Sequence, residues 1–195
     1  ILFKCRMKSY WSNTEQRFIM IYKTPDAAGK LEKVKILLFD VDGVMTDGRI
    51  IYTDGGEEIK AFCVKDGLGI RLLMNAGIKT GVVTGRSSEA LHHRCKNLRI
   101  EYIFDGVLNK ADILNKIIEM TRIQASEIAY IGDDLPDIPI MRCVGIPIAV
   151  ADAHESVIET ACIVTSAKGG NGAIREVCEA ILKAQGQWES VVKRF

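Results

Sequence analysis

A chain of 195 residues with 48% apolar side chains is long enough for one α/β domain with a substantial core, and its composition excludes a disordered or fibrous protein. Lys and Arg number 26 and Asp and Glu 25, so a formal charge of +1 gives no support for nucleic-acid binding through a basic face. No apolar segment approaches the roughly 18 residues that a membrane span needs, and we expect no membrane association.

The cysteines are scattered and form neither a Cys-x-x-Cys pair nor a zinc-ligand spacing with histidine. Such isolated thiols are typical of reduced, mostly buried cysteines, so we expect a cytoplasmic protein. The six are Cys5, Cys63, Cys95, Cys143, Cys162 and Cys178.

The first 30 residues differ from the remainder. Trp11–Glu15 is polar turn material, and Thr24–Gly29 has the composition of a linker. We therefore interpret 1–30 as an N-terminal extension or linker, 31–186 as the folded domain and 187–195 as a C-terminal tail.

From Lys35 onward, short apolar runs alternate with amphipathic segments, which predicts a mainly parallel sheet with right-handed helical crossovers. Residues 49–52 and 58–62 flank Asp54-Gly55-Gly56, a β-hairpin signal. Ser87 is the expected N-cap of the second helix. The expected strands are 36–40, 79–83, 102–104, 128–131, 146–150 and 162–165, and the expected helices are 66–74, 88–97, 110–121, 136–143, 154–160 and 173–184.

The first apolar run ends in two carboxylates, Asp40 and Asp42, followed by Gly43. Alternation along an extended chain directs both carboxylates to the same side. They repel each other unless a cation lies between them or one stays protonated. On this stretch alone, an ordinary turn that contains Asp and Gly is an equally good interpretation.

Polar groups also follow later strands: Thr84-Gly85-Arg86, Lys110 and Asp133-Asp134. Each alone has a structural explanation, as a turn residue, a solvated lysine or a helix cap. Ligands of open parallel sheets bind beyond the carboxyl ends of the strands, so together the groups predict one site. Such a set suits phosphoryl transfer: a nucleophilic aspartate, a second carboxyl as acid and base, a hydroxyl and an ammonium for the phosphoryl oxygens, and carboxylates for Mg²⁺.

Four stretches resemble the motifs of the haloacid dehalogenase superfamily: Asp40–Thr46, Val83–Arg86, Lys110 and Ile131–Asp134. Within it, residues from about 31 to 186 resemble the capless 3-deoxy-D-manno-octulosonate 8-phosphate phosphatases of lipopolysaccharide synthesis. The closer match rests on Thr46–Gly48, Lys65–Ile70, Ala149–His154, Gly169–Val177 and Ala184–Gly186. The resemblance implies a Rossmann-like α/β three-layer sandwich with a protruding β-hairpin and no cap domain.

The resemblance also implies roles. Asp40 would be the nucleophile and Asp42 the general acid and base. The side chains of Asp40 and Asp133 and the backbone carbonyl of Asp42 would hold Mg²⁺. Thr84, Gly85 and Lys110 would bind the phosphoryl group, and Asp134 and Asp137 would orient Lys110 or metal-bound water, although a first-turn charge is the alternative for Asp137. The candidates for binding the sugar acid are Asp47, Lys65, Asp66, Arg86 and Arg175.

Capless relatives form homotetramers, which implies a collar built by the hairpin Gly48–Phe62 and a flexible segment, Gly169–Arg175, that helps to close a neighbour's site. Two departures concern the substrate. Lys65 stands where relatives commonly have Arg, and Asn171 stands where they often have a basic residue. Lysine cannot form the bidentate fork that arginine offers to a carboxylate.

Three alternatives follow from these observations. A phosphatase for a nine-carbon sialic-acid-type 9-phosphate would use the same residues. A phospho-receiver domain also clusters Asp, Thr and Lys, but it has no need for Asp42, Gly43 and Thr46. A non-catalytic tetramerisation domain of this fold would be expected to lose motif carboxylates, and this chain retains them.

Overall fold

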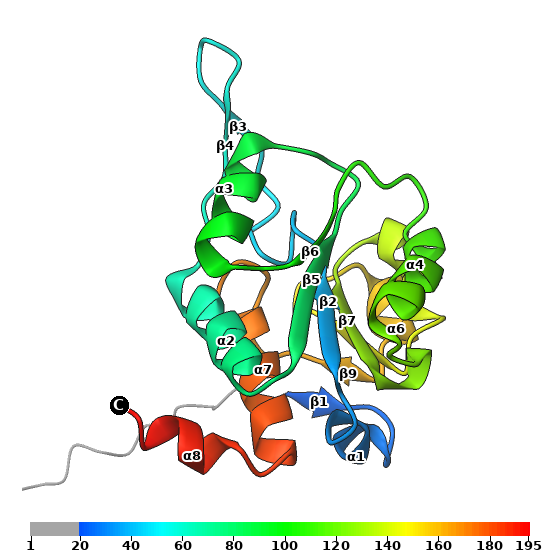
Figure 1. Ribbon diagram of the computed structural model, residues 1–195. Helices are drawn as coiled ribbons and strands as arrows, with labels where there is room; N and C mark the ends of the chain where they lie inside the picture. Colours follow the sequence, from blue (N-terminus) through cyan, green and yellow to red (C-terminus); the bar gives the residue numbers. More distant parts are fainter. Residues whose placement is uncertain (1–19) are drawn as a thin grey trace, which may run out of the picture.

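The central sheet is formed by short apolar runs of the kind found in strands that are covered on both faces. The computed structural model describes residues 20–195, in which seven strands lie in the order β1-β9-β8-β7-β2-β5-β6 (Figure 1). All neighbours pair in parallel except β1 and β9. The strands are β1 (Ile21–Tyr22), β2 (Ile36–Phe39), β5 (Lys79–Val83), β6 (Tyr102–Phe104), β7 (Ile128–Gly132), β8 (Ile146–Ala149) and β9 (Ile163–Val164).

The strand order places the catalytic candidates. From β2 the chain builds one side of the sheet with β5 and β6, and then returns to build the other side with β7, β8 and β9. The order reverses between β2 and β7, and ligands of doubly wound sheets bind at such a switch point. Phe39 is in register with Ile131, so Asp40 and Asp133 leave adjacent strands at the same edge.

Helices cover both faces of the sheet, and alternation along β2 supplies both cores. Leu37 and Phe39 belong to one buried cluster, with α1, α2, α3, α7 and α8. Ile36 and Leu38 belong to the other, with α4, α5 and α6. The helices are α1 (Ala27–Leu31), α2 (Val64–Asn75), α3 (Glu89–Leu98), α4 (Ala111–Thr121), α5 (Ile138–Met141), α6 (Glu155–Thr160), α7 (Ala173–Ala184) and α8 (Trp188–Val192), with short 3-10 turns η1 (Ala125–Glu127) and η2 (Leu135–Asp137). The predicted three-layer fold is confirmed.

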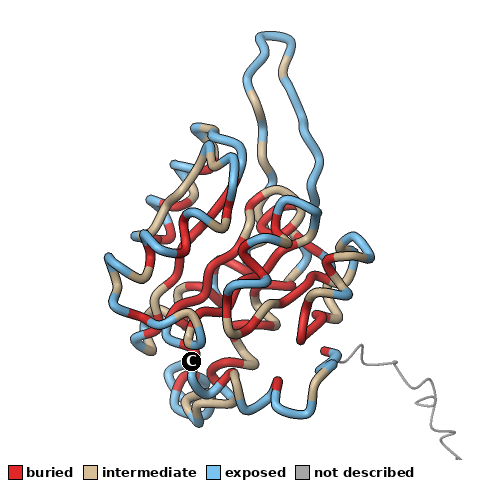
Figure 2. The backbone as a smooth tube through the Cα atoms, turned by 90° about the vertical axis from the view of Figure 1, so that its right-hand side faces the viewer, coloured by how far each residue is buried: buried red, intermediate tan, exposed pale blue. Residues whose placement is uncertain are grey.

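A hairpin of β3 (Ile51–Tyr52) and β4 (Glu58–Ile59) projects from the domain on the side of the carboxyl ends of the strands (Figure 1). Most of its residues are exposed, as Figure 2 shows for the long loop that stands above the buried core.

Three predicted boundaries differ from the structure. Residues 20–31 belong to the fold, because β1 pairs with β9 and α1 packs on α7. The expected tail contains α8, whose Val191 is buried. Ser88, and not Ser87, caps α3, since its hydroxyl accepts a hydrogen bond from the backbone N–H of Leu91. The remainder of the predicted extension, 1–19, lies outside the described residues.

Between residues 20 and 195, no helix is long and apolar enough to cross a lipid bilayer.

Candidate active site

A buried ion-pair network lies at the switch point between β2 and β7. Lys110 is 3% exposed, and its Nζ lies 3.0 Å from Asp40 Oδ2 and 2.6 Å from Asp137 Oδ1. Burial lowers the pKa of Lys110, but the two carboxylates outweigh it and raise the pKa above its ordinary value. Lys110 therefore stays an ammonium beside Asp40.

Asp137 organises this network, as predicted for a residue that orients Lys110. Its Oδ1 accepts hydrogen bonds from Lys110 and from the hydroxyl of Tyr130, the latter at 2.6 Å. Its Oδ2 accepts from the backbone N–H groups of Asp133 and Asp134, at 2.8 and 3.3 Å. Both oxygens are occupied, so Asp137 fixes Lys110 and the backbone after β7. Tyr130 was not predicted from the sequence, because a tyrosine in an apolar strand is expected to be a core residue.

Two glycines permit this close packing. Gly43 has φ +91°, and a Cβ there would overlap the carboxylate of Asp133. A Cβ at Gly132 would lie 2.6 Å from Cβ of Asp137. Gly43 thus lets the loop after β2 approach Asp133, and Gly132 lets the end of β7 approach Asp137.

The residues present fit a divalent cation. One oxygen each of Asp40, Asp133 and Asp137 lies within 4.8 Å of the others. Oδ1 of Asp40 and Oδ1 of Asp133 are buried and have no hydrogen-bond partner among residues 20–195, whereas both oxygens of Asp137 accept hydrogen bonds. Buried carboxylate oxygens without a donor are costly, and a hard cation such as Mg²⁺ prefers oxygen ligands of this kind. Asp40 and Asp133 are the side chains that would hold it.

The pKa values reflect the same need for positive charge. Burial raises the pKa of Asp40 from 3.8 to about 6, against the opposing effect of Lys110. Burial, with the carboxylates of Asp137 and Asp40, raises the pKa of Asp133 from 3.8 to about 8. A cation between Asp40 and Asp133 would reverse both shifts.

Asp42 lies in a second cluster, which reaches onto the hairpin. Lys60 pairs with Asp42 Oδ1 and lies 2.7 Å from Glu58 Oε1. Arg86 Nη2 lies 2.9 Å from Glu58 Oε2, and Arg86 Nε lies 3.5 Å from Asp42 Oδ2. Of these, Asp42 and Arg86 were predicted site residues. Glu58 and Lys60 were missed, although their i, i+2 spacing in an expected strand is a signal that they share a face.

The turn after β5 lies at the same edge of the sheet. Thr84 is 2% exposed, and its backbone is held by Phe104 and Val107. Its Oγ1 accepts a hydrogen bond from the N–H of Arg86 at 3.4 Å. Thr84 and the adjacent exposed Gly85 thus stand where the sequence placed phosphate binding, and that role stays a prediction.

Other predicted site residues have different surroundings. Asp66 caps α7: its carboxylate accepts from the N–H groups of Gly172 and Arg175, at 3.2 and 2.7 Å. The Arg175 guanidinium pairs with Glu179 at 2.7 Å and stacks on Trp188. None of these contacts involves Asp40, Asp42 or Asp133. Asp66 and Arg175 therefore support α7, and their role in binding the sugar acid stays a prediction.

Three further candidates are exposed. Asp47 pairs with Arg49 at the base of the hairpin, at 3.5 Å. Asp134 accepts from the N–H of Leu135 and caps η2, and it makes no described contact with Lys110. Lys65 lies on the first turn of α2. A direct role for Asp47 and Lys65 in the sugar site stays a prediction, as does a role for Asp134 in orienting metal-bound water.

The segment Gly169–Arg175, which we expected to be flexible, is hydrogen-bonded to its own chain, and its flexibility stays a prediction. The N–H of Gly170 donates to the carbonyl of Val44 at 2.9 Å, and that of Gly169 donates to Asp152 at 3.0 Å. A Cβ at Gly169 would overlap the carbonyl of Gly43. These glycines serve close packing against the catalytic loop of their own chain.

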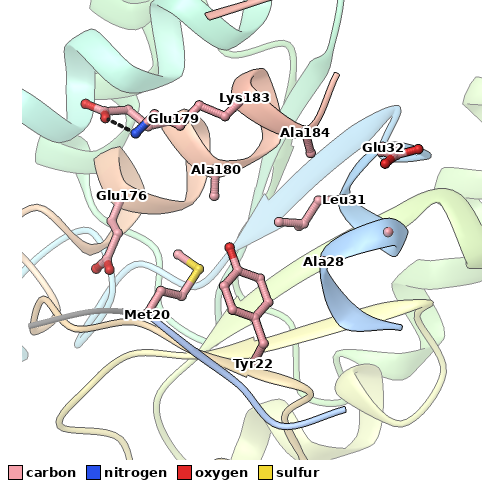
Figure 3. A pocket seen from close by; sticks show the side chains of 11 residues that line it. Met20, Tyr22, Ala28, Leu31, Glu32, Glu176, Glu179, Ala180, Lys183 and Ala184 are labelled. Carbon is pink, nitrogen blue, oxygen red and sulfur yellow. Dashed lines mark hydrogen bonds and ion pairs between the residues drawn. The ribbon is translucent and has the colours of Figure 1, made fainter. Parts of the chain in front are cut away.

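A cavity of about 610 Å³ lies between α1, α7 and the start of β1 (Figure 3). Two of its three acidic side chains have partners, since Glu179 pairs with Lys183 and Glu176 accepts from Ser166 and Ala167. No residue of the catalytic network lines it. We therefore place the active site at the switch point and not in this cavity.

Comparison with known proteins identifies the family. Residues 100–177 match the model of the haloacid dehalogenase-like hydrolase family. The chain is 43% identical over 162 residues, which is 83% of this chain and 86% of its relative, to the 3-deoxy-D-manno-octulosonate 8-phosphate phosphatase of Escherichia coli K12. The chain belongs to the 3-deoxy-D-manno-octulosonate 8-phosphate phosphatase family. The predicted resemblance is confirmed, and the chain is a hydrolase of the haloacid dehalogenase superfamily.

Solved structures of family members agree. The phosphatase of Yersinia pestis superposes with a TM-score of 0.83 at 42% identity, over 85% of this chain and 89% of that one. The phosphatase of Moraxella catarrhalis superposes with a TM-score of 0.85 at 41% identity, over 87% and 98%. That structure is a complex with a magnesium ion, a phosphate ion and 3-deoxy-D-manno-octulosonate. Membership of this phosphatase family excludes the phospho-receiver alternative.

Proposed function

We propose that this chain is a Mg²⁺-dependent phosphatase of lipopolysaccharide biosynthesis that hydrolyses 3-deoxy-D-manno-octulosonate 8-phosphate to the free sugar acid and phosphate. The observation that carries the proposal is the pair of unpartnered buried oxygens on Asp40 and Asp133, beside the fixed ammonium of Lys110. The name of the relatives and the molecules bound in the Moraxella catarrhalis structure support the substrate and the metal.

In the first step, a carboxylate oxygen of Asp40 attacks phosphorus, and the bond between phosphorus and the sugar oxygen breaks. Asp42 gives a proton to the departing oxygen, so a neutral hydroxyl leaves. This first displacement leaves the phosphoryl group on Asp40 as an aspartyl-phosphate.

In the second step, Asp42 takes a proton from water as the water oxygen attacks phosphorus. The bond between phosphorus and Asp40 breaks, which returns the carboxylate and releases phosphate. Lys110 donates toward the phosphoryl oxygens throughout, and Asp137 holds it in place. Mg²⁺, when bound, supplies positive charge that lets the phosphoryl group approach the carboxylates.

We also propose a cytoplasmic homotetramer built around the hairpin. Ile51 and Ile59 face each other across the hairpin and are 46% and 47% exposed, beside Tyr52 at 59%. Exposed apolar side chains on a projecting element favour self-association. The described cysteines are all free, which is typical of a reducing compartment. A contribution of a neighbour's C-terminal residues to the site stays a prediction.

The test is a side-by-side measurement of phosphate release from the eight-carbon 8-phosphate and a nine-carbon sialic-acid-type 9-phosphate, with Mg²⁺. We expect a higher kcat/KM for the eight-carbon substrate, with Asp40→Asn as the blank. Preference for the nine-carbon substrate, or equal turnover of unrelated sugar phosphates, would overturn the substrate assignment.

A further inference from the structure

The hairpin delivers a buried ammonium to the general acid and base. The Lys60 side chain is only 2% exposed, although it comes from an element whose other residues mostly face solvent. Its two anionic partners are Asp42 and Glu58, whose side chains are 19% and 15% exposed. Burying an ammonium is costly, so its place against Asp42 depends on both carboxylates.

The two oxygens of Asp42 are unequal as a result. Oδ1 accepts the hydrogen bond from Lys60. Oδ2 is buried and has no hydrogen-bond partner among the described residues, and Arg86 Nε stays 3.5 Å away. A carboxylate anchored through one oxygen has its rotation fixed and its other oxygen directed.

Glu58 holds Lys60 in place. It contacts Lys60 with Oε1 and Arg86 with Oε2, so charges alternate around the four side chains. Because the net charge of this ring is zero, Lys60 gains a stable position without an excess positive charge at the site.

We propose that Lys60 is a positioning residue for the reaction: it anchors Asp42 through Oδ1, so that Oδ2 is the atom that carries the proton to the leaving oxygen. The proposal rests on the proposed function only in taking Asp42 as the general acid. It assigns a catalytic contribution to the hairpin, which otherwise serves assembly.

Leaving-group dependence separates this role from a structural one. A sugar hydroxyl needs a proton to depart, whereas the nitrophenolate of p-nitrophenyl phosphate departs without one. The ratio kcat/KM reports the steps up to the first irreversible one, so the later activation of water does not enter. We expect Lys60→Met to lower kcat/KM for the sugar phosphate about 10- to 100-fold and to change kcat/KM for p-nitrophenyl phosphate less than about 3-fold.

Glu57→Gln, an exposed position of the same hairpin, is the matched control and should leave both substrates unaffected. In an Asp42→Asn background, Lys60→Met should have almost no further effect on the sugar phosphate, because Lys60 acts through Asp42. Equal losses on both substrates, or a full additional loss in the Asp42→Asn background, would overturn the proposal. So would a rise in KM alone.

Failure of the proposed function looks different. A wild-type enzyme that hydrolyses p-nitrophenyl phosphate but not 3-deoxy-D-manno-octulosonate 8-phosphate contradicts the proposed substrate. The role of Lys60 is then tested on the alkyl phosphate that the enzyme hydrolyses best. On that alkyl phosphate, the same selective loss supports the proposal and its absence overturns it.

Discussion

At the scale of single residues, the site is a problem of buried charge. Asp40, Asp133 and Asp137 crowd together, and Lys110 is the cation that the described chain places among them. Lys110 and backbone N–H groups satisfy Asp137, but Oδ1 of Asp40 and Oδ1 of Asp133 have no donor. Asp137 therefore fixes the position of Lys110, whereas Asp40 and Asp133 keep oxygens that could bind a metal or a substrate.

Asp137→Asn tests this division. The substitution removes the charge that fixes Lys110 and leaves part of the network unpaired, so we expect about 3 kcal/mol less unfolding free energy and a kcat at least about tenfold lower. Tyr130→Phe removes one hydrogen bond to the same oxygen and should cost only about 1 to 2 kcal/mol. Urea unfolding and steady-state kinetics measure both. A wild-type stability for Asp137→Asn would contradict the role of Asp137.

Magnesium binding should depend on pH. In the metal-free protein, the pKa values of Asp40 and Asp133 are raised from 3.8 to about 6 and about 8. Between the ordinary pKa of 3.8 and these raised values, the folded state holds more protons than the unfolded state. The free energy of unfolding of the metal-free protein therefore falls as the pH rises through this range. Mg²⁺ binds the deprotonated carboxylates, and the Tm gain from Mg²⁺ should therefore grow from about pH 5.5 to about pH 8.

Thermal melts with and without Mg²⁺ at the two pH values check this dependence, and Asp133→Asn should lose most of the gain at the higher pH. A Tm gain that is the same at both pH values would place the metal on other groups.

At the scale of elements, loops that are far apart in sequence build the site by close approach. Gly169 and Gly170 pack on the loop that carries Asp40 and Asp42, and Asp66 of α2 caps α7 across the domain. Helix α7 is thus connected to the loop after β2 through the backbone contacts of Gly169 and Gly170. A disturbance at either end should reach the nucleophile.

Gly169→Ala should show this coupling. A Cβ at this position overlaps the carbonyl of Gly43, so we expect a loss of about 1 to 3 kcal/mol of unfolding free energy and reduced kcat. Gly29→Ala is the matched control, because no atom lies within 4 Å of its added Cβ in helix α1, and it should stabilise by about 0.5 to 1 kcal/mol. Equal effects of the two substitutions would refute the close packing at Gly169.

The elements that the sequence predicts best are those with strong local signals. The strand that ends at Asp40 and the one before Asp133 are apolar runs bounded by turn residues, and both lie where expected. Strand β1 was missed because its two residues are 58% and 42% exposed and show no alternation. An edge strand of this kind is formed by its pairing with β9, which a local pattern does not reveal.

The residues of the candidate site also divide into those that local sequence patterns predict and those that they do not. Asp40 follows a strand and Lys110 opens a helix, so topology alone predicts their meeting. Glu58 and Lys60 reach the site only because the hairpin folds back over it, which is a tertiary relation. The capping role of Asp66 was missed because the N–H groups that donate to its carboxylate lie more than a hundred residues away in sequence.

At the scale of the whole molecule, residues 20–195 form no cap domain, and a projecting hairpin stands beside the site (Figure 1). Its apolar side chains are exposed, while its charged pair reaches inward to Asp42. One element would therefore serve both the proposed self-association and the proposed general acid and base. Assembly and catalysis should be coupled through it.

Replacing Ile51 and Ile59 together by Ser should dissociate the proposed tetramer, because it removes the exposed cross-strand apolar pair. Light scattering on eluted fractions measures the mass of wild type and variant. Asp54→Asn, at the exposed tip of the hairpin, is the control and should leave the mass unchanged. A wild-type chain that elutes as a monomer with full activity would remove the tetramer from the account.

In the proposed reaction, Asp40 carries the phosphoryl group. Acid quenching during turnover, followed by borohydride reduction, converts an aspartyl-phosphate to homoserine, which peptide mass spectrometry can locate. We predict homoserine at position 40, only when substrate and Mg²⁺ are both present, and at least about 10³-fold lower turnover for Asp40→Asn. Continued turnover by Asp40→Asn, or modification at another residue, would contradict the account.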